Sequence, residues 1–155
     1  MNEQRAKDVF ETLCDTLKAQ GISHEAQEDK LSIRFQARGE DIPLDIYIQV
    51  DAERDLIMLL SHLPFEVEQD KRIEMAVAIS VINNQLVDGC FDYGLEDGHI
   101  IFRLTNSYLE SEVDQDLFEY MLFLSFGTID EYNDKLMMIA KGLLPLAKFI
   151  ESELN

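Results

Sequence analysis

The chain has 155 residues, of which 46% are hydrophobic, and its 13 basic and 31 acidic residues give a formal net charge of −18. This apolar fraction excludes a disordered acidic tail, and the length fits one domain spanning residues 1–155. The negative charge repels phosphate backbones, so it argues against nucleic-acid binding and favours either a neutral or basic partner or simple solubility.

The N-terminus and the cysteines predict a cytoplasmic protein. Residues 1–20 carry charges throughout and lack the apolar core of a secretion signal. No stretch approaches the roughly 18 uncharged apolar residues of a membrane span. Cys14 and Cys90 are therefore expected to be reduced thiols.

The first half of the chain predicts one helix followed by three strands. Apolar residues recur every three or four positions in 2–20, which indicates an amphipathic helix ended by Gly21. Strict alternation predicts half-buried strands over 31–36 and 44–50. Residues 56–60 are apolar without alternation, which predicts a strand covered on both faces and ended by Pro64.

The middle of the chain predicts a helix and a hairpin. Residues 70–86 contain neither Gly nor Pro, and their centre is apolar nearly all round, so we expect a helix buried on more than one side. Residues 91–95 and 100–104 alternate on either side of Asp97-Gly98, which is typical of a type I′ hairpin turn.

The C-terminal part predicts helix from Ser111 onward, with Asp114 in the place of a weak capping box. Gly127 and Thr128 interrupt its apolar stripe, and Thr128 could cap a second helix. Pro145 would bend that helix or lie near a break in it. Whether 113–153 forms one bent helix or two stays open at this point.

The predicted element order is α-β-β-β-α-β-β-α. Meandering strands, a hairpin and separate helices are typical of the α+β class. We therefore predict a five-stranded, mainly antiparallel sheet with helices on one face.

Two segments carry a family resemblance: residues 76–104, with Ile82-Asn-Asn-Gln-Leu86 before Asp97-Gly98, and the Asp130-Glu-Tyr-Asn-Asp-Lys135 stretch of the closing helix. With the element order and the acidity, the chain resembles the YbjN-like family, which shares the fold of type III secretion chaperones. The resemblance implies a small bacterial cytosolic protein with a regulatory or sensory role. The chaperones are acidic, usually homodimeric and non-enzymatic, and they hold a client segment on apolar patches. No catalytic residue carries over.

Metal motifs fail on inspection. Residues 51–62 and 110–121 have the acidic spacing of a calcium loop, but they lack its glycine at position six and its glutamate at position twelve. His24, His62 and His99 fall in different elements, and the chain has no CxxC or HxxxH pair for zinc. We therefore predict no metal and no cofactor.

Catalytic motifs fail as well. The chain contains no GxGxxG or GxSxG sequence. Cys90 is expected near the open end of the hairpin and His99 near its turn, so the two side chains should not meet as a thiol and its base. We predict that the protein is not an enzyme and has no catalytic residues.

The informative feature is surplus apolar surface in 56–60, 75–82 and 121–126. Either these segments share one core, or a second copy covers part of them in a homodimer. The dimer would use the 70–86 helix, and the predicted interface residues are Ile73, Val77 and Val81.

The function predicted from the sequence is non-enzymatic binding of a partner protein or peptide, in a chaperone-like or regulatory role. The candidate contact residues are Tyr47 and Ile101 on the solvent side of strands and the exposed side of Phe10. The alternatives are a small-molecule sensor or small enzyme with a pocket between the sheet and the C-terminal helices, or a secretion chaperone proper.

Overall fold

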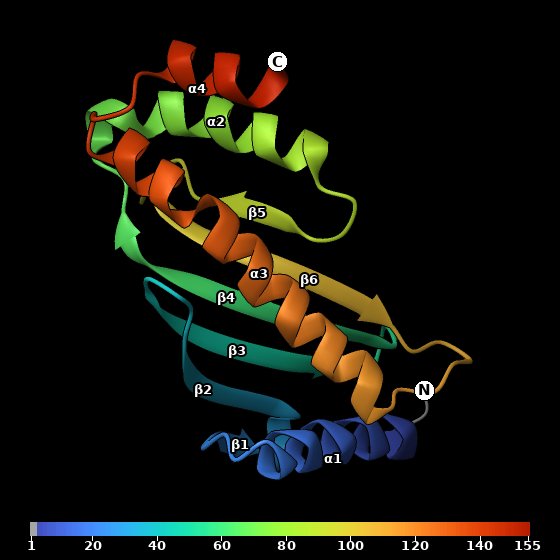
Figure 1. Ribbon diagram of the computed structural model, residues 1–155. Helices are drawn as coiled ribbons and strands as arrows, with labels where there is room; N and C mark the ends of the chain where they lie inside the picture. Colours follow the sequence, from blue (N-terminus) through green and yellow to red (C-terminus); the bar gives the residue numbers. More distant parts are fainter. Residues whose placement is uncertain (1–2) are drawn as a thin grey trace.

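A computed structural model describes residues 3–155 (Figure 1). Its elements are α1 (Glu3–Ala19), β1 (Glu25–Gln27), η1 (Glu28–Lys30), β2 (Ser32–Arg38), β3 (Pro43–Asp51), β4 (Leu56–Glu66), η2 (Gln69–Lys71), α2 (Arg72–Gln85), β5 (Cys90–Tyr93), β6 (His99–Ser107), α3 (Gln115–Ala140) and α4 (Leu146–Leu154). The strands form one antiparallel sheet in the order β1-β2-β3-β4-β6-β5. The long helix α3 crosses this sheet in Figure 1, with α1 below it and α2 and α4 above.

The sheet has six strands where the sequence predicted five. The additional strand, β1, has three exposed residues and pairs with β2 at the edge of the sheet. Such a strand is held by backbone hydrogen bonds alone, so it carries no apolar alternation that the sequence could reveal.

Strand β4 corrects a second prediction. It runs from Leu56 to Glu66, and its burial alternates although its residues are apolar in succession. Leu59 and its alternate neighbours face the core, whereas Leu60 and its own neighbours face away from the helices and are half-buried. The strand continues past Pro64 because pairing with β6 is irregular between His62 and Glu66, where a missing N–H costs nothing. The prediction of cover on both faces was therefore wrong within this chain.

Helices α1 and α2 lie within the predicted ranges. The predicted stripe of α1 is buried, and Gly21 follows it at φ +71°, as a C-terminal stop requires. Helix α2 packs against α3, α4 and β5, which accounts for its apolar circumference. Its outer edge, with Ile73 and Val77, is exposed.

Helix α3 is continuous through Gly127, so of the two alternatives left open by the sequence, a second helix starting at Thr128 does not form. Gly127 lies on the outer side, with open space around it, and the buried inner side holds the helix together despite a glycine cost of about 1 kcal/mol. The helix begins after Asp114, whose side chain accepts a 2.9 Å hydrogen bond from Leu117 N–H, and not at Ser111. The helical conformation is interrupted at 141–145, so the C-terminal part forms two helices, with Pro145 directly before α4.

The β5–β6 connection spans 94–98 and is longer than the predicted two-residue turn. Gly98 N–H donates to the Gly94 carbonyl at 2.7 Å, and Asp97 Oδ1 accepts from His99 N–H at 2.9 Å. Gly98 has φ +72°, and its backbone lies tightly against Val67. These hydrogen bonds within the loop close a connection that is wider than a two-residue turn.

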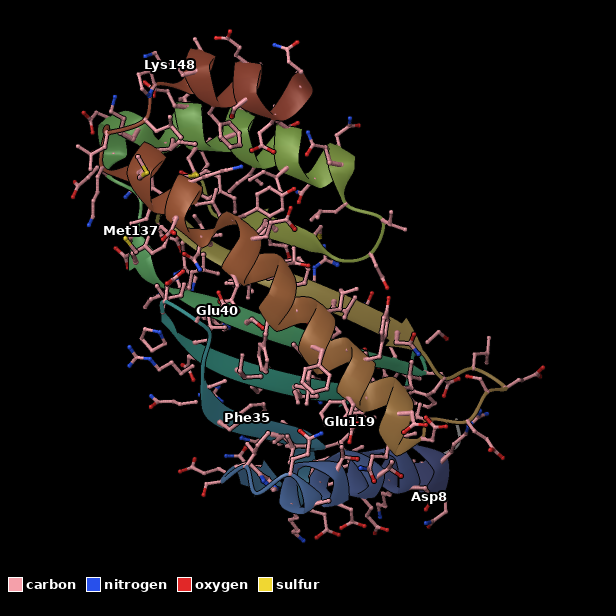
Figure 2. The ribbon with its side chains drawn as sticks, in the orientation of Figure 1. Asp8, Phe35, Glu40, Glu119, Met137 and Lys148 are labelled. Carbon is pink, nitrogen blue, oxygen red and sulfur yellow. The ribbon has the colours of Figure 1, made fainter. Side chains whose placement is uncertain are left out.

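The core lies between the sheet and the helices. It includes the fully buried Leu59, Phe102 and Phe118. The β2–β3 turn, where Figure 2 labels Glu40, is tied to α3 because Glu40 N–H donates to Asp130 Oδ1 at 2.9 Å. Over residues 3–155, none of the helices combines the length and the apolar character that crossing a bilayer requires.

Candidate functional site: the open face of the sheet

The sheet has a second face, which none of the described helices covers, and we call it the open face. Side chains on neighbouring strands line up there in rows, because the antiparallel register places them directly opposite one another. One row consists of Arg34, Tyr47, Leu60, Arg103 and Cys90. The next row consists of Gln36, Asp45, His62, Ile101 and Asp92.

The middle of the open face is apolar. Tyr47, Leu60 and Ile101 lie on three neighbouring strands, and Met58 precedes Leu60 on the same face of β4. All four side chains are partly exposed. They form the apolar centre of the open face, where apolar surface stays in contact with water unless another molecule covers it.

Charged groups flank the apolar centre. Arg34 and Arg103 each contact another side chain on the same face. The Arg34 guanidinium lies 5.0 Å from the centre of the Tyr47 ring. Arg103 donates to Asp92 from Nε at 2.6 Å and from Nη2 at 3.1 Å. These contacts hold the side chains in place, so the apolar centre has a defined, largely pre-organised border.

Cys90 lies beside this border. Its Sγ is 3.6 Å from Arg103 Nη2, and burial raises its pKa, so the thiol stays protonated at neutral pH. Cys90 pairs with Arg103 on β6, four positions along that strand from His99. The register agrees with the expectation that Cys90 and His99 do not form a nucleophile–base pair.

The structure brings together two histidines that the sequence placed only in different elements. His62 Nδ1 lies 2.9 Å from His99 Nε2, and the ring centres are 5.2 Å apart. Burial lowers the pKa of His62, and the neighbouring His99 lowers it further, against the opposing effect of Asp45. The pair lines a hollow of about 390 Å³ at the end of the open face.

The residues predicted to contact a partner do not all lie together. Tyr47 and Ile101 both belong to the open face. Phe10 is 5% exposed and packs in the core, which corrects the expectation of an exposed side, because the buried stripe of α1 is wide enough to include it.

The residues predicted for a dimer interface lie on α2, away from the open face. Ile73 is 68% exposed and Val77 is 40% exposed. Val81 is partly buried and packs against the core. Only the first two therefore offer substantial apolar surface at the outer edge of α2.

The acidic 51–55 segment forms a turn. Asp51 Oδ1 accepts hydrogen bonds of 3.0 Å from the N–H groups of Glu53 and Arg54, so it closes the turn itself. Within the described part of the chain, no three His, Cys, Asp or Glu side chains are placed to hold a metal ion together.

The fold and the open face define the class of protein. It is a small α+β protein with an antiparallel six-stranded sheet, helices on one face, and an exposed surface of mixed apolar and paired charged groups on the other.

Comparison with known proteins gives the family. The family model of YbjN, described as "Putative bacterial sensory transduction regulator", matches residues 10–137. This match covers most of the chain, so the chain belongs to the YbjN family.

The solved structures include a protein of similar fold. The crystal structure of YbjN, described as "a putative transcription regulator from E. coli", superposes with a TM-score of 0.59 at 16% sequence identity. The alignment covers 81% of this chain and 92% of the E. coli chain. At this identity the likeness concerns the fold alone. No curated protein matches the sequence.

Proposed function

We propose that this chain is a non-enzymatic regulatory protein that binds a partner protein through the open face of its sheet. The observation that carries the proposal is the apolar centre formed by Tyr47, Met58, Leu60 and Ile101 on a face that none of the helices in residues 3–155 covers. The description of the family as a regulator supports this class of function.

The burial of β4 supports the choice of surface. Its apolar residues alternate between the core and the open face, and Leu60 and Met58 gain no cover from any helix. A strand that faced only water on that side would be expected to carry polar residues at these positions. A partner that removes the apolar centre from water gains about 25 cal/mol for each Å² of apolar area, before the costs of association.

The charge of the chain supports the kind of partner. A formal net charge of −18 attracts basic surfaces over long range, whereas the close charge pairs on the open face leave its centre to apolar contacts. We therefore propose a partner with a neutral or basic surface and an extended apolar segment, held as the resemblance to secretion chaperones implies.

The predicted pocket between the sheet and the C-terminal helices finds less support. That space is filled by buried side chains such as Phe102 and Phe118. The hollow beside His62 lies instead at the end of the open face. We keep binding of a partner as the proposed function, and the absence of catalysis and the cytoplasmic location stay predictions.

Self-association is a separate proposal that uses another surface. Ile73 and Val77 leave apolar area exposed along the outer edge of α2. We propose that the chain forms a homodimer that buries this edge and leaves the open face free. Sedimentation of the wild-type and Val77→Asp proteins tests this, and a monomeric wild-type protein at all concentrations would contradict it.

The test of partner binding places a negative charge either on the open face or, as a control, at a residue outside it. We would capture partners from cells with the wild-type chain and with Leu60→Asp and Ile101→Asp, and identify them by quantitative mass spectrometry. The matched control is Val87→Asp, at an exposed apolar residue outside the open face. We expect a specific partner to be lost with both open-face variants and retained with the control.

The candidate partner is then purified and titrated against all four proteins. Loss of affinity restricted to Leu60→Asp and Ile101→Asp supports the proposal. Equal affinity for all four proteins, or a loss caused only by Val87→Asp, assigns the interaction to another surface and contradicts it. Circular dichroism checks that the variants are folded.

A further inference from the structure

The open face carries one constellation that binding of an apolar segment does not use. His62 on β4 and His99 on β6 are diagonal neighbours, because His62 pairs with Ile101 and His99 pairs with Glu66. From His62 to Glu66 the chain advances four residues along β4, whereas their partners are only two residues apart on β6. This irregular pairing bends β4 where the two histidines lie. Two nitrogen atoms, His62 Nδ1 and His99 Nε2, consequently face each other at 2.9 Å.

We propose that His62 and His99 bind a divalent transition-metal ion of the Zn²⁺ class, through His62 Nδ1 and His99 Nε2. Zinc–imidazole bonds are about 2.0–2.1 Å long, so two nitrogens at this separation subtend an angle of about 90° at a shared ion. Opening the pair to about 3.3 Å would give the tetrahedral angle that zinc favours. The side chains therefore need only a small movement to bind the ion.

The ion would replace the proton that the two rings now share. A hydrogen bond between two imidazoles requires N–H on one nitrogen and a lone pair on the other. For the ion to bind, the ring that donates shifts its proton to its outer nitrogen, and both inner nitrogens present lone pairs. The lowered pKa of His62 supports this step, because it favours the neutral ring at neutral pH.

The charges around the pair favour a cation. Asp45 lies directly opposite His62, and Glu66 lies directly opposite His99. Arg34 is the charged neighbour that opposes a cation here, since it lowers the pKa of His62. Two carboxylates against one guanidinium leave a negative local balance, within a chain of net charge −18.

The type of protein ligand determines the class of ion, and the number of ligands limits the affinity. No third metal-binding side chain joins the pair within residues 3–155, so water or another donor would complete the coordination in the hollow of about 390 Å³. Imidazole nitrogen suits zinc and its neighbours, whereas Ca²⁺ and Mg²⁺ prefer oxygen. We expect weaker binding than in a four-ligand structural zinc site.

This inference goes beyond the proposed binding of a partner and is tested without one. The chain has three histidines, so imidazole NMR signals of the full-length protein can be assigned by substitution. During titration with zinc sulfate, we expect the His62 and His99 signals to shift together and saturate at one ion per chain. The His24 signals should stay in place, and magnesium sulfate should shift none of them.

Calorimetric titration with zinc sulfate then tests the ligands one at a time. We expect His62→Gln and His99→Gln each to weaken zinc binding at least about tenfold. His24→Gln should bind as the wild type does, and Cys90→Ser tests whether the thiol of the open face is a ligand instead.

Three results would overturn the proposal: unchanged binding in His62→Gln or His99→Gln, loss of binding only in Cys90→Ser, or no shift of the His62 and His99 signals up to about 1 mM zinc. The NMR titration uses the wild-type protein, so it decides the question even if a variant fails to fold.

Discussion

Both faces of the sheet carry apolar residues of β4, but only one face is covered by the described helices. Leu59 and Leu60 are neighbours on β4, yet Leu59 is 0% exposed beneath the helices, and Leu60 is half-buried on the open face. The first contributes to the core, and the second lies in the surface that we propose for partner binding. The comparison shows that apolar character does not by itself say whether a strand residue is buried in the core or stays partly exposed.

The largest expected effect separates the two faces directly. Leu59→Ala should lower the free energy of unfolding by about 2–5 kcal/mol, because it leaves a cavity in the core. Leu60→Ala should cost less than about 1.5 kcal/mol, since its side chain already contacts water. Urea denaturation of both variants measures the difference, and equal losses would show that the open face is packed as tightly as the core.

The next effect concerns the hairpin that carries His99 to the open face. Gly98 has φ +72°, and a Cβ there would lie 2.5 Å from the Val67 carbonyl oxygen. We expect Gly98→Ala to destabilise the protein by at least about 1–2 kcal/mol, from left-handed strain and the collision. Thermal unfolding measures it, with Gly21→Ala as a control that has the strained φ but no neighbour within 4 Å. Equal losses would exclude the contact with Val67 as a cause.

A smaller effect of opposite sign is expected on the helix that covers the core face. Gly127 is exposed in the middle of α3, with nothing within 4 Å of the position of an added Cβ. Gly127→Ala should therefore stabilise the protein by about 0.5–1 kcal/mol, through helix propensity alone. A rise in the urea midpoint at unchanged slope is the expected result. Destabilisation would indicate a bend or break of α3 at this glycine.

The smallest effect is a pH dependence that belongs to the open face. The pKa of His62 in the folded protein is lowered from 6.5, chiefly by burial, so the unfolded chain takes up its proton first as the pH falls. This contribution to stability is complete above about pH 6.5 and is lost as the pH falls from there through the lowered folded pKa.

The measurement compares unfolding free energies at about pH 7.5 and about pH 5.5 in the absence of metal. His62→Gln should lose less stability than the wild type over this interval. An identical loss in the wild type and in His62→Gln would show that this side chain does not contribute to the pH dependence.

The sequence predicted much of the fold because its signals there are local. The stripe of 2–20 predicted α1, the alternation of 44–50 predicted β3, and both follow from the repeat of the element itself. The prediction failed where the local sequence signal was weak or was compatible with two structures. Strand β1 has three exposed residues and therefore no apolar alternation to predict it. Gly127 suggested a break in α3, but burial of the opposite side of the helix outweighs the cost of the glycine.

The sequence predicted less of the candidate site. Tyr47 and Ile101 could be assigned to the solvent side of strands, because alternation fixes which residues share a face. Phe10 could not be distinguished from a surface residue, since a helix stripe has no sharp border in the sequence. The meeting of His62 and His99 had no local signal, because 37 residues separate them along the chain.

The sequence by itself determined the α+β class, the acidic charge, the inward and outward sides of most elements, and a surplus of apolar residues. Only the tertiary structure decided which strands are neighbours, in which register they pair, and which face the helices leave uncovered. The physical reason is that periodicity is encoded within each segment, whereas strand order and cover depend on packing between segments far apart in the chain.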